Sequence, residues 1–365
     1  MKLFEISNYL DTRVPLAFQE EYDNCGLLIG NKSSKINSVL ISLDCTESVV
    51  DEAIRNKHNL IISHHPLLFN GIKKITGSNY VERITEKAIR NNIAIYSMHT
   101  NLDNIQGGVS FQIAKRISLQ DVKVLKPKTN LLSYLVVYCP KTHTQDIKKA
   151  LHSVGAGQLG SFYDNCSFVS SGIGSFRPLP GSNSFSGKIG ENSYEEEDKI
   201  EVIYYSYLQS KVLTALKEAH PYQEIAYSCC SLINDSQVGS GVIGTLSKEI
   251  TLKKFLNYVK KQMNISVIKY TLSHNQDKIK KIAICGGSGS FLLEDAIKND
   301  ADVYISSDFK YHDFFNADNK ISVFDIGHYE SEYYTQHLIY DILKEKFSKL
   351  AIHLTSVCTN PVLYY

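Results

Sequence analysis

The chain has 365 residues, and its 39 basic and 38 acidic side chains give a formal net charge of +1. This length predicts two or three domains, and the balanced charge gives no general attraction to nucleic acid or anionic lipid. Residues 1–13 lack the apolar stretch of a secretory signal, and no run reaches the ~20 apolar residues that span a bilayer.

Residues 36–126 alternate short β-rich runs with helical patterns, which is typical of strand–helix–strand units on a parallel sheet. Thr46 is the expected N-cap of the first helix, because apolar residues follow it at helical spacing. The pattern predicts strands at 36–44, 59–63 and 93–98 and helices at 46–56, 79–92 and 107–117.

The pattern of strands and helices changes over residues 127–236. The pattern predicts strands at 131–140, 166–178, 184–191, 199–207 and 226–232, with the second and third as a glycine-rich pair, and helices at 144–154 and 208–219. This succession resembles the βαββαβ order of the ferredoxin-like plan, so we expect an inserted small domain. A disordered linker over 170–193 is the alternative, but the interleaved Phe and Ile favour paired strands. The acidic run 195–198 is expected in a solvated loop.

Residues 237–365 again alternate β-rich runs with helical patterns. Strands are expected at 281–285, 302–307 and 320–326, a glycine loop at 286–290, and helices at 291–299 and 331–347. The predicted fold class is therefore α/β. The halves 1–126 and 237–365 form one α/β domain around a di-metal site, and a ferredoxin-like domain is inserted between them.

Two adjacent histidines follow the strand 59–63. In open α/β sheets ligands collect outside the carboxyl ends of the strands, so His64 and His65 stand in a favourable place. Neighbouring side chains of a regular strand point to opposite faces, so these rings converge only if the chain is turning. Pro66 favours such an end to the strand. The alternative is one hydrogen-bonded loop histidine beside an exposed one.

Two further strand ends carry similar groups. His99 and Asp103 follow the strand 93–98, although Asp103 could simply cap a turn. His328 and Glu332 follow the strand 320–326, and their spacing of four puts both on one face if a helix begins near His328. A plain surface pair of His328 and Glu332 is the alternative. The coincidence of three such strand ends favours a shared site.

The five candidate ligands are His64, His65, Asp103, His328 and Glu332. Five are too many for one catalytic zinc ion, which typically has three protein ligands, but they suit two metal ions with a bridging carboxylate. Nitrogen and oxygen donors favour zinc or iron, with manganese or cobalt as alternatives. Two divalent cations per subunit would activate water, so the pattern predicts a hydrolase.

Other polar groups are expected near this site. Asp308, Lys310 and His312 follow the strand 302–307 and could hydrogen-bond the ligands from behind, and His99 and His312 are candidate proton shuttles. Loop residues that cap a helix are the alternative. The glycine loop 286–290 lacks the order of a phosphate-binding motif, so a tight turn is expected there.

The eight cysteines are scattered and form no Cys-x-x-Cys pair. Together with the missing signal segment, they predict a protein of the reducing cytoplasm whose thiols pack as small apolar groups. The adjacent Cys229 and Cys230 leave a redox role open.

The motifs "EYDNCGLLIG", "SHHPLLF", "HTNLD", "SSDFKYHD" and "DIGHYESE", in this order, resemble the GTP cyclohydrolase I type 2 homolog family, also called the Ngg-interacting-factor-like family. The segments "VGAGQLGSFYDNCSF" and "AHPYQEIAY" resemble the PII-like or CutA-like insert of its longer bacterial members. Ser306 and Ser307 depart from the Thr-Gly pair of many members.

The resemblance implies a di-metal centre on the same five residues and a toroidal homohexamer whose metal ions face an inner cavity. The family name implies hydrolytic opening of a guanine ring, so the expected substrate is a nucleotide or a cyclic amide. Two functions remain open at this point. One is a metal-dependent hydrolase. The other is a metal-binding or regulatory scaffold without turnover, in which the insert gates the cavity or senses a ligand.

Overall fold

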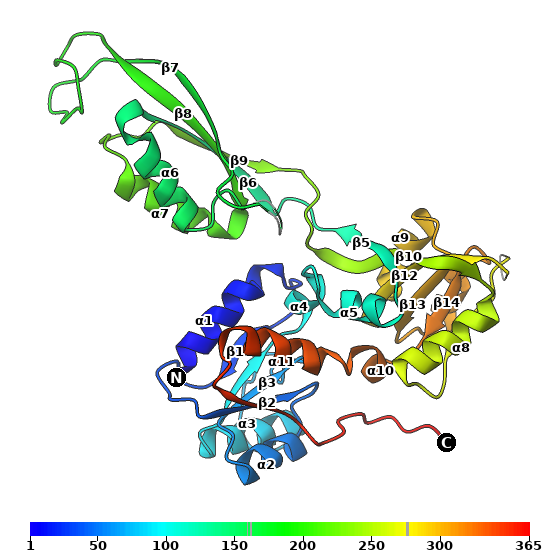
Figure 1. Ribbon diagram of the computed structural model, residues 1–365. Coiled ribbons are helices and arrows are strands. Elements are labelled where there is room, and N and C mark those ends of the chain that lie inside the picture. The colour runs from blue at the N-terminus through cyan, green and yellow to red at the C-terminus, as the bar shows by residue number, and fades with distance from the viewer. Residues whose placement is uncertain (159, 161–162, 275–276) are drawn as a thin grey trace. The chain divides into compact units, whose positions relative to one another are not determined.

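The computed structural model describes residues 1–158, 160, 163–274 and 277–365, and Figure 1 labels its helices and strands. The chain forms two compact units. The larger one comprises Met1–Pro127 and Val238–Tyr365, and the smaller one comprises Lys128–Gln237. Within the described residues, no helix combines the length and apolar character that crossing a membrane requires.

The first sheet of the larger unit has the strand order β1-β4-β3-β2-β15. Strands β2, β3, β4 and β15 run parallel, whereas β1 is antiparallel to β4. The elements are α1 (Leu3–Arg13), η1 (Leu16–Phe18), β1 (Gly26–Ile29), β2 (Ser38–Ser42), α2 (Glu47–Arg55), β3 (Leu60–Ser63), α3 (Tyr80–Arg90), β4 (Ala94–Ser97), α4 (Thr100–Asn104), α5 (Val109–Arg116) and β15 (Ala351–Leu354). The carboxyl ends of β3 and β4 therefore lie at one edge.

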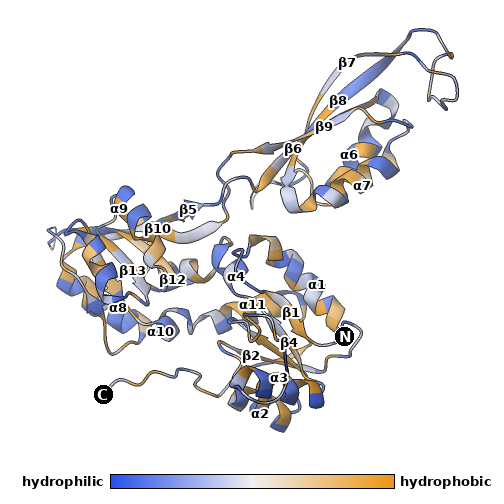
Figure 2. Cartoon of the chain, turned by 180° about the vertical axis from the view of Figure 1, so that it is seen from behind, coloured by the Kyte–Doolittle hydropathy of each residue, from blue (hydrophilic) through white to orange (hydrophobic). Residues whose placement is uncertain are grey.

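Local sequence signals explain this half. The side chain of Thr46 accepts a hydrogen bond from the backbone N–H of Val49, which confirms its predicted role as the cap of α2. Every residue of β3 and β4 is buried, as expected for strands of a parallel sheet with helices on both faces. In Figure 2 these strands carry hydrophobic colours, while the covering helix α3 is largely hydrophilic. The strands and helices predicted over 36–117 are confirmed.

The second sheet has the order β11-β14-β13-β12-β10-β5, in which β12, β13 and β14 are parallel. Its elements are β5 (Gln120–Pro127), β10 (Gly239–Ile250), α8 (Leu252–Met263), β11 (Lys269–Tyr270), β12 (Ile279–Ser288), η4 (Ser290–Leu292), α9 (Leu293–Lys298), β13 (Val303–Ser307), η5 (Tyr311–Ala317), β14 (Ser322–Asp325), α10 (His328–Glu332) and α11 (Thr335–Lys346). The two halves exchange strands, because β15 joins the first sheet and β5 joins the second.

Two predictions for this half are corrected. The glycine loop does not begin at residue 286, because β12 continues through Ser288. The single helix expected over 331–347 is two helices, α10 and α11, separated at Tyr333 and Tyr334. The hydroxyl of Tyr334 donates to the carbonyl of Met263, and its ring lies 3.1 Å from the guanidinium carbon of Arg116. These tertiary contacts hold the chain at the break between the helices.

The smaller unit contains β6 (Leu132–Pro140), η2 (Lys141–His143), α6 (Thr144–Ser153), β7 (Phe168–Phe176), β8 (Ser193–Tyr205), η3 (Ser206–Leu208), α7 (Gln209–Ala219) and β9 (Tyr227–Leu232). Its sheet has the order β7-β8-β6-β9, and all neighbouring strands are antiparallel. Helices α6 and α7 pack together and share a core with the strands. Of the segment 154–168 that carries the insert resemblance, residues 159, 161 and 162 lie outside the described residues.

The glycine-rich strand pair of this unit was wrongly predicted. Residues 184–191, all of them described, lie outside the strands, and β7 pairs instead with β8. The acidic run 195–198 lies inside β8 and not in a solvated loop. Each of its side chains has a partner there: Glu195 binds Ser186, Glu196 binds Lys141, Glu197 binds Tyr222, and Asp198 binds Thr144 and Ser171. Such contacts allow charged residues in a strand whose neighbours supply donors.

A buried glutamate fastens the C-terminal segment to α2. The carboxylate of Glu52, only 5% exposed, accepts hydrogen bonds from the hydroxyl of Thr355 and from the backbone N–H and hydroxyl of Ser356. Burial alone would raise the pKa of Glu52, but these hydrogen bonds outweigh it and lower the pKa below its ordinary value. The ionised carboxylate is therefore the form that holds the segment.

Replacing Glu52 with alanine is expected to destabilise the protein by about 1 to 3 kcal/mol, because three hydrogen-bond donors of Thr355 and Ser356 lose their acceptor. The stabilisation is present above the unfolded-state pKa of about 4.3 and is lost as the pH falls through the lower folded-state pKa. Denaturant unfolding of wild type and variant at pH 7 and at pH 3 measures this. Glu47→Ala, also on α2, breaks an exposed pair with Arg83 of α3 and should cost little. Equal losses for both variants would contradict the assignment.

Candidate metal centre

Five side chains from three strand ends lie in one cluster. His64 and His65 follow β3, Asp103 lies in α4 directly after β4, and His328 and Glu332 lie in α10 after β14. His64 Nε2 is 3.7 Å from both Asp103 Oδ1 and Glu332 Oε1. The other oxygen of Glu332, Oε2, is 2.9 Å from His65 Nε2 and 3.0 Å from His328 Nε2. The Nε2 atoms of His65 and His328 are 3.2 Å apart. The structure thus brings together all five residues that the sequence singles out as ligands.

The adjacent histidines converge because the chain bends directly after β3. The backbone N–H groups of His64 and His65 still bond to the carbonyls of Ser42 and Leu43, at 3.2 and 3.0 Å. The two rings are 5.0 Å apart, and the His64 ring is completely buried. The sequence required such a turn for both imidazoles to face one site.

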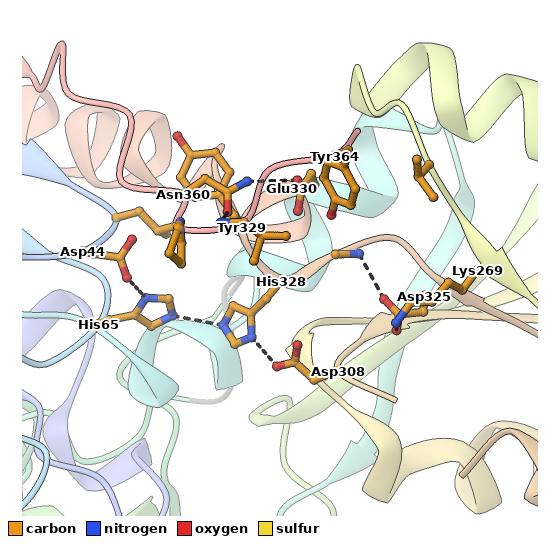
Figure 3. Close-up of a pocket in the computed structure, with 15 residues that line it drawn as sticks. Asp44, His65, Lys269, Asp308, Asp325, His328, Tyr329, Glu330, Asn360 and Tyr364 are labelled. Carbon is orange, nitrogen blue, oxygen red and sulfur yellow. Dashed lines mark hydrogen bonds and ion pairs between the residues drawn. The ribbon is translucent and has the colours of Figure 1, made fainter. Parts of the chain in front are cut away.

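In each of His64, His65 and His328, the ring nitrogen Nδ1 contacts a hydrogen-bond acceptor. His64 Nδ1 lies 2.7 Å from the carbonyl of Met98, His65 Nδ1 lies 2.7 Å from Asp44 Oδ1, and His328 Nδ1 lies 2.6 Å from Asp308 Oδ2. Figure 3 shows the last two contacts, with the His65 and His328 rings side by side between them. Partners of this kind fix the tautomer of a metal-binding histidine and turn Nε2 toward the ion.

Asp44 was not among the predicted site residues. It follows β2 and emerges at the same sheet edge as His64 and His65. Its other oxygen accepts a hydrogen bond from the hydroxyl of Thr359. A signal existed, since a carboxylate directly after a buried parallel strand stands where ligands collect. Its pairing with His65 could not be read from the spacing.

Replacing Asp44 with asparagine is expected to lower metal affinity by roughly 10- to 100-fold, because His65 loses the charged partner that orients its ring. Competition with a chromophoric chelator measures the affinity. Asp51→Asn, an exposed residue of α2 that pairs with Lys87, serves as the control and should leave the affinity unchanged. An unchanged affinity in the Asp44 variant would show that this contact does not position a ligand.

Two buried atoms of the cluster, His64 Nε2 and Asp103 Oδ1, have no hydrogen bond. They lie 3.7 Å apart. Unpaired buried polar atoms are costly, and a cation between them would satisfy both at once. Two groups of three residues hold ligand atoms within 4.8 Å of one another: His64, His65 and His99, and His65, His328 and Glu332. The donors therefore fit a metal ion bound by nitrogen and oxygen.

The charges in the cluster oppose one another strongly. Burial and the nearby Glu332 raise the pKa of Asp103 well above its ordinary value. Burial would also raise the pKa of Glu332, but the surrounding histidines outweigh it and hold the pKa well below the ordinary value. Burial would lower the pKa of His65 and of His328. Hydrogen bonds to carboxylates outweigh this effect and raise the two pKa values to about 10 and about 9. Protons thus occupy positions that a cation would fill.

His99 also reaches the cluster. Its ring lies 5.2 and 5.3 Å from the rings of His64 and His65. Its Nδ1 is 2.9 Å from Asp23 Oδ1, and Asp23 accepts a further hydrogen bond from the backbone N–H of Thr100. The role of Asp23 was missed by the sequence reasoning, although it stands in the "EYDNCG" motif.

The three polar residues after β13 are placed differently from one another. Asp308 contacts His328, as expected for a group that orients a ligand. Lys310 is exposed and caps η5, where its backbone N–H bonds to Asp313. His312 is exposed, and its ring packs against Tyr311 and Phe315 at 5.2 and 6.1 Å. For Lys310 and His312 these contacts match the alternative of polar residues around a helix start.

Gly287 approaches the cluster closely with its backbone. Its φ angle is +66°, a conformation that L side chains rarely adopt. A Cβ atom built there would lie 2.1 Å from Glu332 Oε1. Its N–H donates to the hydroxyl of Ser331, and its carbonyl accepts from Ser306 and Ser307. The absence of a side chain therefore makes room for the carboxylate of Glu332.

A pocket of about 470 Å³ opens beside the cluster. His65 and His328 contribute to its lining, together with Lys269 from β11 and residues of the C-terminal segment 360–364. Pockets of this size hold small organic molecules. Two candidate ligands thus border a space that a substrate could fill.

The chain is similar to several known proteins. Curated relatives named "GTP cyclohydrolase 1 type 2 homolog" include one from Staphylococcus epidermidis, 34% identical over 100% of both chains, and one from Bacillus subtilis, 36% identical over 95% of this chain and 90% of the relative. The crystal structure of a Bacillus cereus protein related to NIF3 superposes with a TM-score of 0.85, at 36% identity over 100% of this chain and 99% of that one.

A Staphylococcus aureus structure, of protein SA1388, matches with a TM-score of 0.79 at 30% identity, over 100% of this chain and 99% of that chain. The family model described as Duf34/NIF3 (NGG1p interacting factor 3) matches residues 1–361. The family expected from five ordered motifs is thereby confirmed: the chain belongs to the Duf34/NIF3 family.

Proposed function

We propose that the cluster holds two divalent cations bridged by Glu332. The observation that carries this proposal is that the two carboxylate oxygens of Glu332 face different histidines. Oε1 faces His64 at 3.7 Å, whereas Oε2 faces His65 and His328 at 2.9 and 3.0 Å. Asp103 would complete the His64 side, 3.7 Å from His64 Nε2. Nitrogen and oxygen ligands without thiolate favour zinc or iron, with manganese or cobalt as alternatives.

We infer further that the protein is a metal-dependent hydrolase acting on a nucleotide or a cyclic amide. Paired cations would supply Lewis acidity and lower the pKa of a bound water, which is the chemistry of hydrolysis. Among this chain's own residues, His99 is the best placed to move a proton, because Asp23 holds its Nδ1 and its ring lies beside the rings of His64 and His65. His312 is a weaker candidate, since its ring contacts lie on η5.

The test combines elemental analysis of the purified protein with a turnover screen against nucleotides and cyclic amides, with and without chelator. We expect close to two metal ions per chain and turnover that disappears with chelation. His65→Ala should lose both, while His274→Ala, an exposed histidine of the same unit, should keep both. Turnover by metal-free protein would refute the proposal. Bound metal without any turnover would favour the scaffold alternative.

The smaller unit is proposed to be a ferredoxin-like domain of the PII-like or CutA-like kind. Its succession of strand, helix, strand, strand, helix and strand, with the order β7-β8-β6-β9, supports this. A homohexamer is proposed from the family resemblance alone. Light scattering of the full chain should then give about six times the chain mass of 41.1 kDa, and a smaller assembly would reject it.

A further inference from the structure

A second pocket of about 470 Å³ lies along the loop that connects β3 to α3, two elements that Figure 1 labels. All of its lining residues fall between Pro66 and Glu82, so the loop begins directly after the proposed ligand His65. No proposed metal ligand lines this space, which is distinct from the pocket that His65 and His328 border. Its volume suits a small organic molecule.

Phe69 connects this loop pocket to the metal centre. It lines the pocket, and its ring lies 6.3 Å from the ring of His99. The ring of Tyr22 lies 6.1 Å from that of Phe69 on the same side. Both aromatic rings are exposed, Phe69 at 44% and Tyr22 at 64%. A flat ring system can therefore stack on Phe69 beside His99 while the rest of the same molecule enters the pocket.

Two lysines of the pocket have unpaired charges. Lys73 and Lys74 line it and are exposed, and no ion pair of either one is found among the residues that the structure describes. The neighbouring helix α3 differs, because its Lys87 pairs with Asp51 of α2 at 2.8 Å. Lysine ammonium groups are compact charges that bind phosphate well. The loop pocket thus offers two cations to an incoming anion.

The one acid among the lining residues already has partners. Glu82 Oε2 accepts hydrogen bonds from the backbone N–H and the hydroxyl of Thr76, at 2.9 and 2.8 Å, and from the backbone N–H of Ser78 at 3.0 Å. Its Oε1 accepts from Asn79 Nδ2 at 2.8 Å. These donors fix the loop and offset the charge of the carboxylate. The attraction for an anion therefore comes from the lysine side chains and not from the start of α3.

We propose that the loop pocket binds the phosphate group of a substrate whose ring stacks on Phe69 beside His99. Lys73 and Lys74 supply the charge for the phosphate. The paired cations proposed at the cluster are positive as well, so both sites attract the same anionic molecule. The inference deepens the proposed hydrolase, on which it rests, because it favours a phosphorylated heterocycle such as a nucleotide over an unphosphorylated cyclic amide.

The test is equilibrium binding by ligand-observed NMR to full-length protein loaded with zinc. The probes are adenosine, guanosine, cytidine and uridine, each compared with its 5′-monophosphate. In at least one series the wild type should bind the monophosphate about ten-fold or more tightly than the nucleoside. Lys73→Ala combined with Lys74→Ala should reduce this ratio to below about three-fold. Lys253→Ala combined with Lys254→Ala, an adjacent exposed pair of α8, is the matched control and should keep the wild-type ratio.

Metal ions can bind phosphate directly, so each measurement is repeated with metal-depleted protein. The effect of removing Lys73 and Lys74 should persist there, because it does not act through the cations. Metal content is measured in the same samples. Failure of the proposed di-metal centre therefore shows separately, as metal-poor wild-type protein, whereas failure of the phosphate subsite shows as a ratio that does not depend on the two lysines.

Three outcomes would overturn the inference. One is the absence of any preference for a monophosphate, or of any binding at millimolar concentration, in all four series. The second is a preference that survives the loss of both lysines, which would assign the phosphate to the metal ions. The third is a changed assembly mass of the Lys73 and Lys74 double variant in light scattering, which would make the loop a contact between copies of the chain. Phe69→Leu should weaken nucleoside and monophosphate alike, and an unchanged nucleoside affinity would contradict the stacking.

Discussion

Replacing Glu332 with glutamine is expected to remove most of the bound metal, with affinity reduced by more than about 100-fold, a larger loss than for a residue that merely orients a ligand. The substitution keeps the size of the side chain but removes the charge that faces three imidazoles. Glutamine cannot present two anionic oxygens to two cations. Elemental analysis after purification without added metal measures the effect.

The matched control is Glu345→Gln, an exposed glutamate of α11 that pairs loosely with Arg13. It should keep the full metal content. The thermal midpoint of the Glu332 variant should also become insensitive to added zinc, because a ligand stabilises only the state that binds it. A Glu332 variant that still holds two ions per chain would disprove the bridging role.

Replacing Gly287 with alanine is expected to be nearly as damaging, although this residue donates no ligand. The new Cβ would sit 2.1 Å from Glu332 Oε1 at a backbone φ of +66°. Steric crowding of a packed interior and the left-handed backbone together predict a stability loss of about 2 to 4 kcal/mol. Because the crowded atom is a proposed ligand, metal content should fall as well. Denaturant unfolding and elemental analysis of the same preparation report the two effects.

The variant Gly107→Ala distinguishes the cost of the left-handed backbone from the cost of steric crowding. Gly107 also has a positive φ, +80°, but a Cβ there would meet nothing within 4 Å. This variant should show the backbone cost of roughly 1 to 2 kcal/mol and keep its metal. Equal metal loss in both variants would mean that the contact with Glu332 is not responsible.

The sequence was sufficient for the parallel strands and for the five clustered residues. Both rest on strong local signals, namely buried β-branched runs such as "LIIS" and polar groups directly after them. The pairings of Asp44 with His65 and of Asp23 with His99 could not be predicted, because a hydrogen bond between residues 21 or 76 positions apart leaves no local pattern. The prediction of a solvated loop over residues 195–198, which lie in β8, failed for a similar reason. Propensity disfavours a strand there, and contacts with Lys141, Thr144 and Tyr222 override it.

The strand exchange between the two halves has a consequence for biosynthesis. During translation, His64 and His65 leave the ribosome some 260 residues before His328 and Glu332, and the sheet that carries them awaits β15 at Ala351–Leu354. A nascent chain can therefore offer a cation only a partial set of donors until residues 328–354 have been synthesised. At the proposed metal centre, binding of a cation would then follow the synthesis of both halves and report that they have come together.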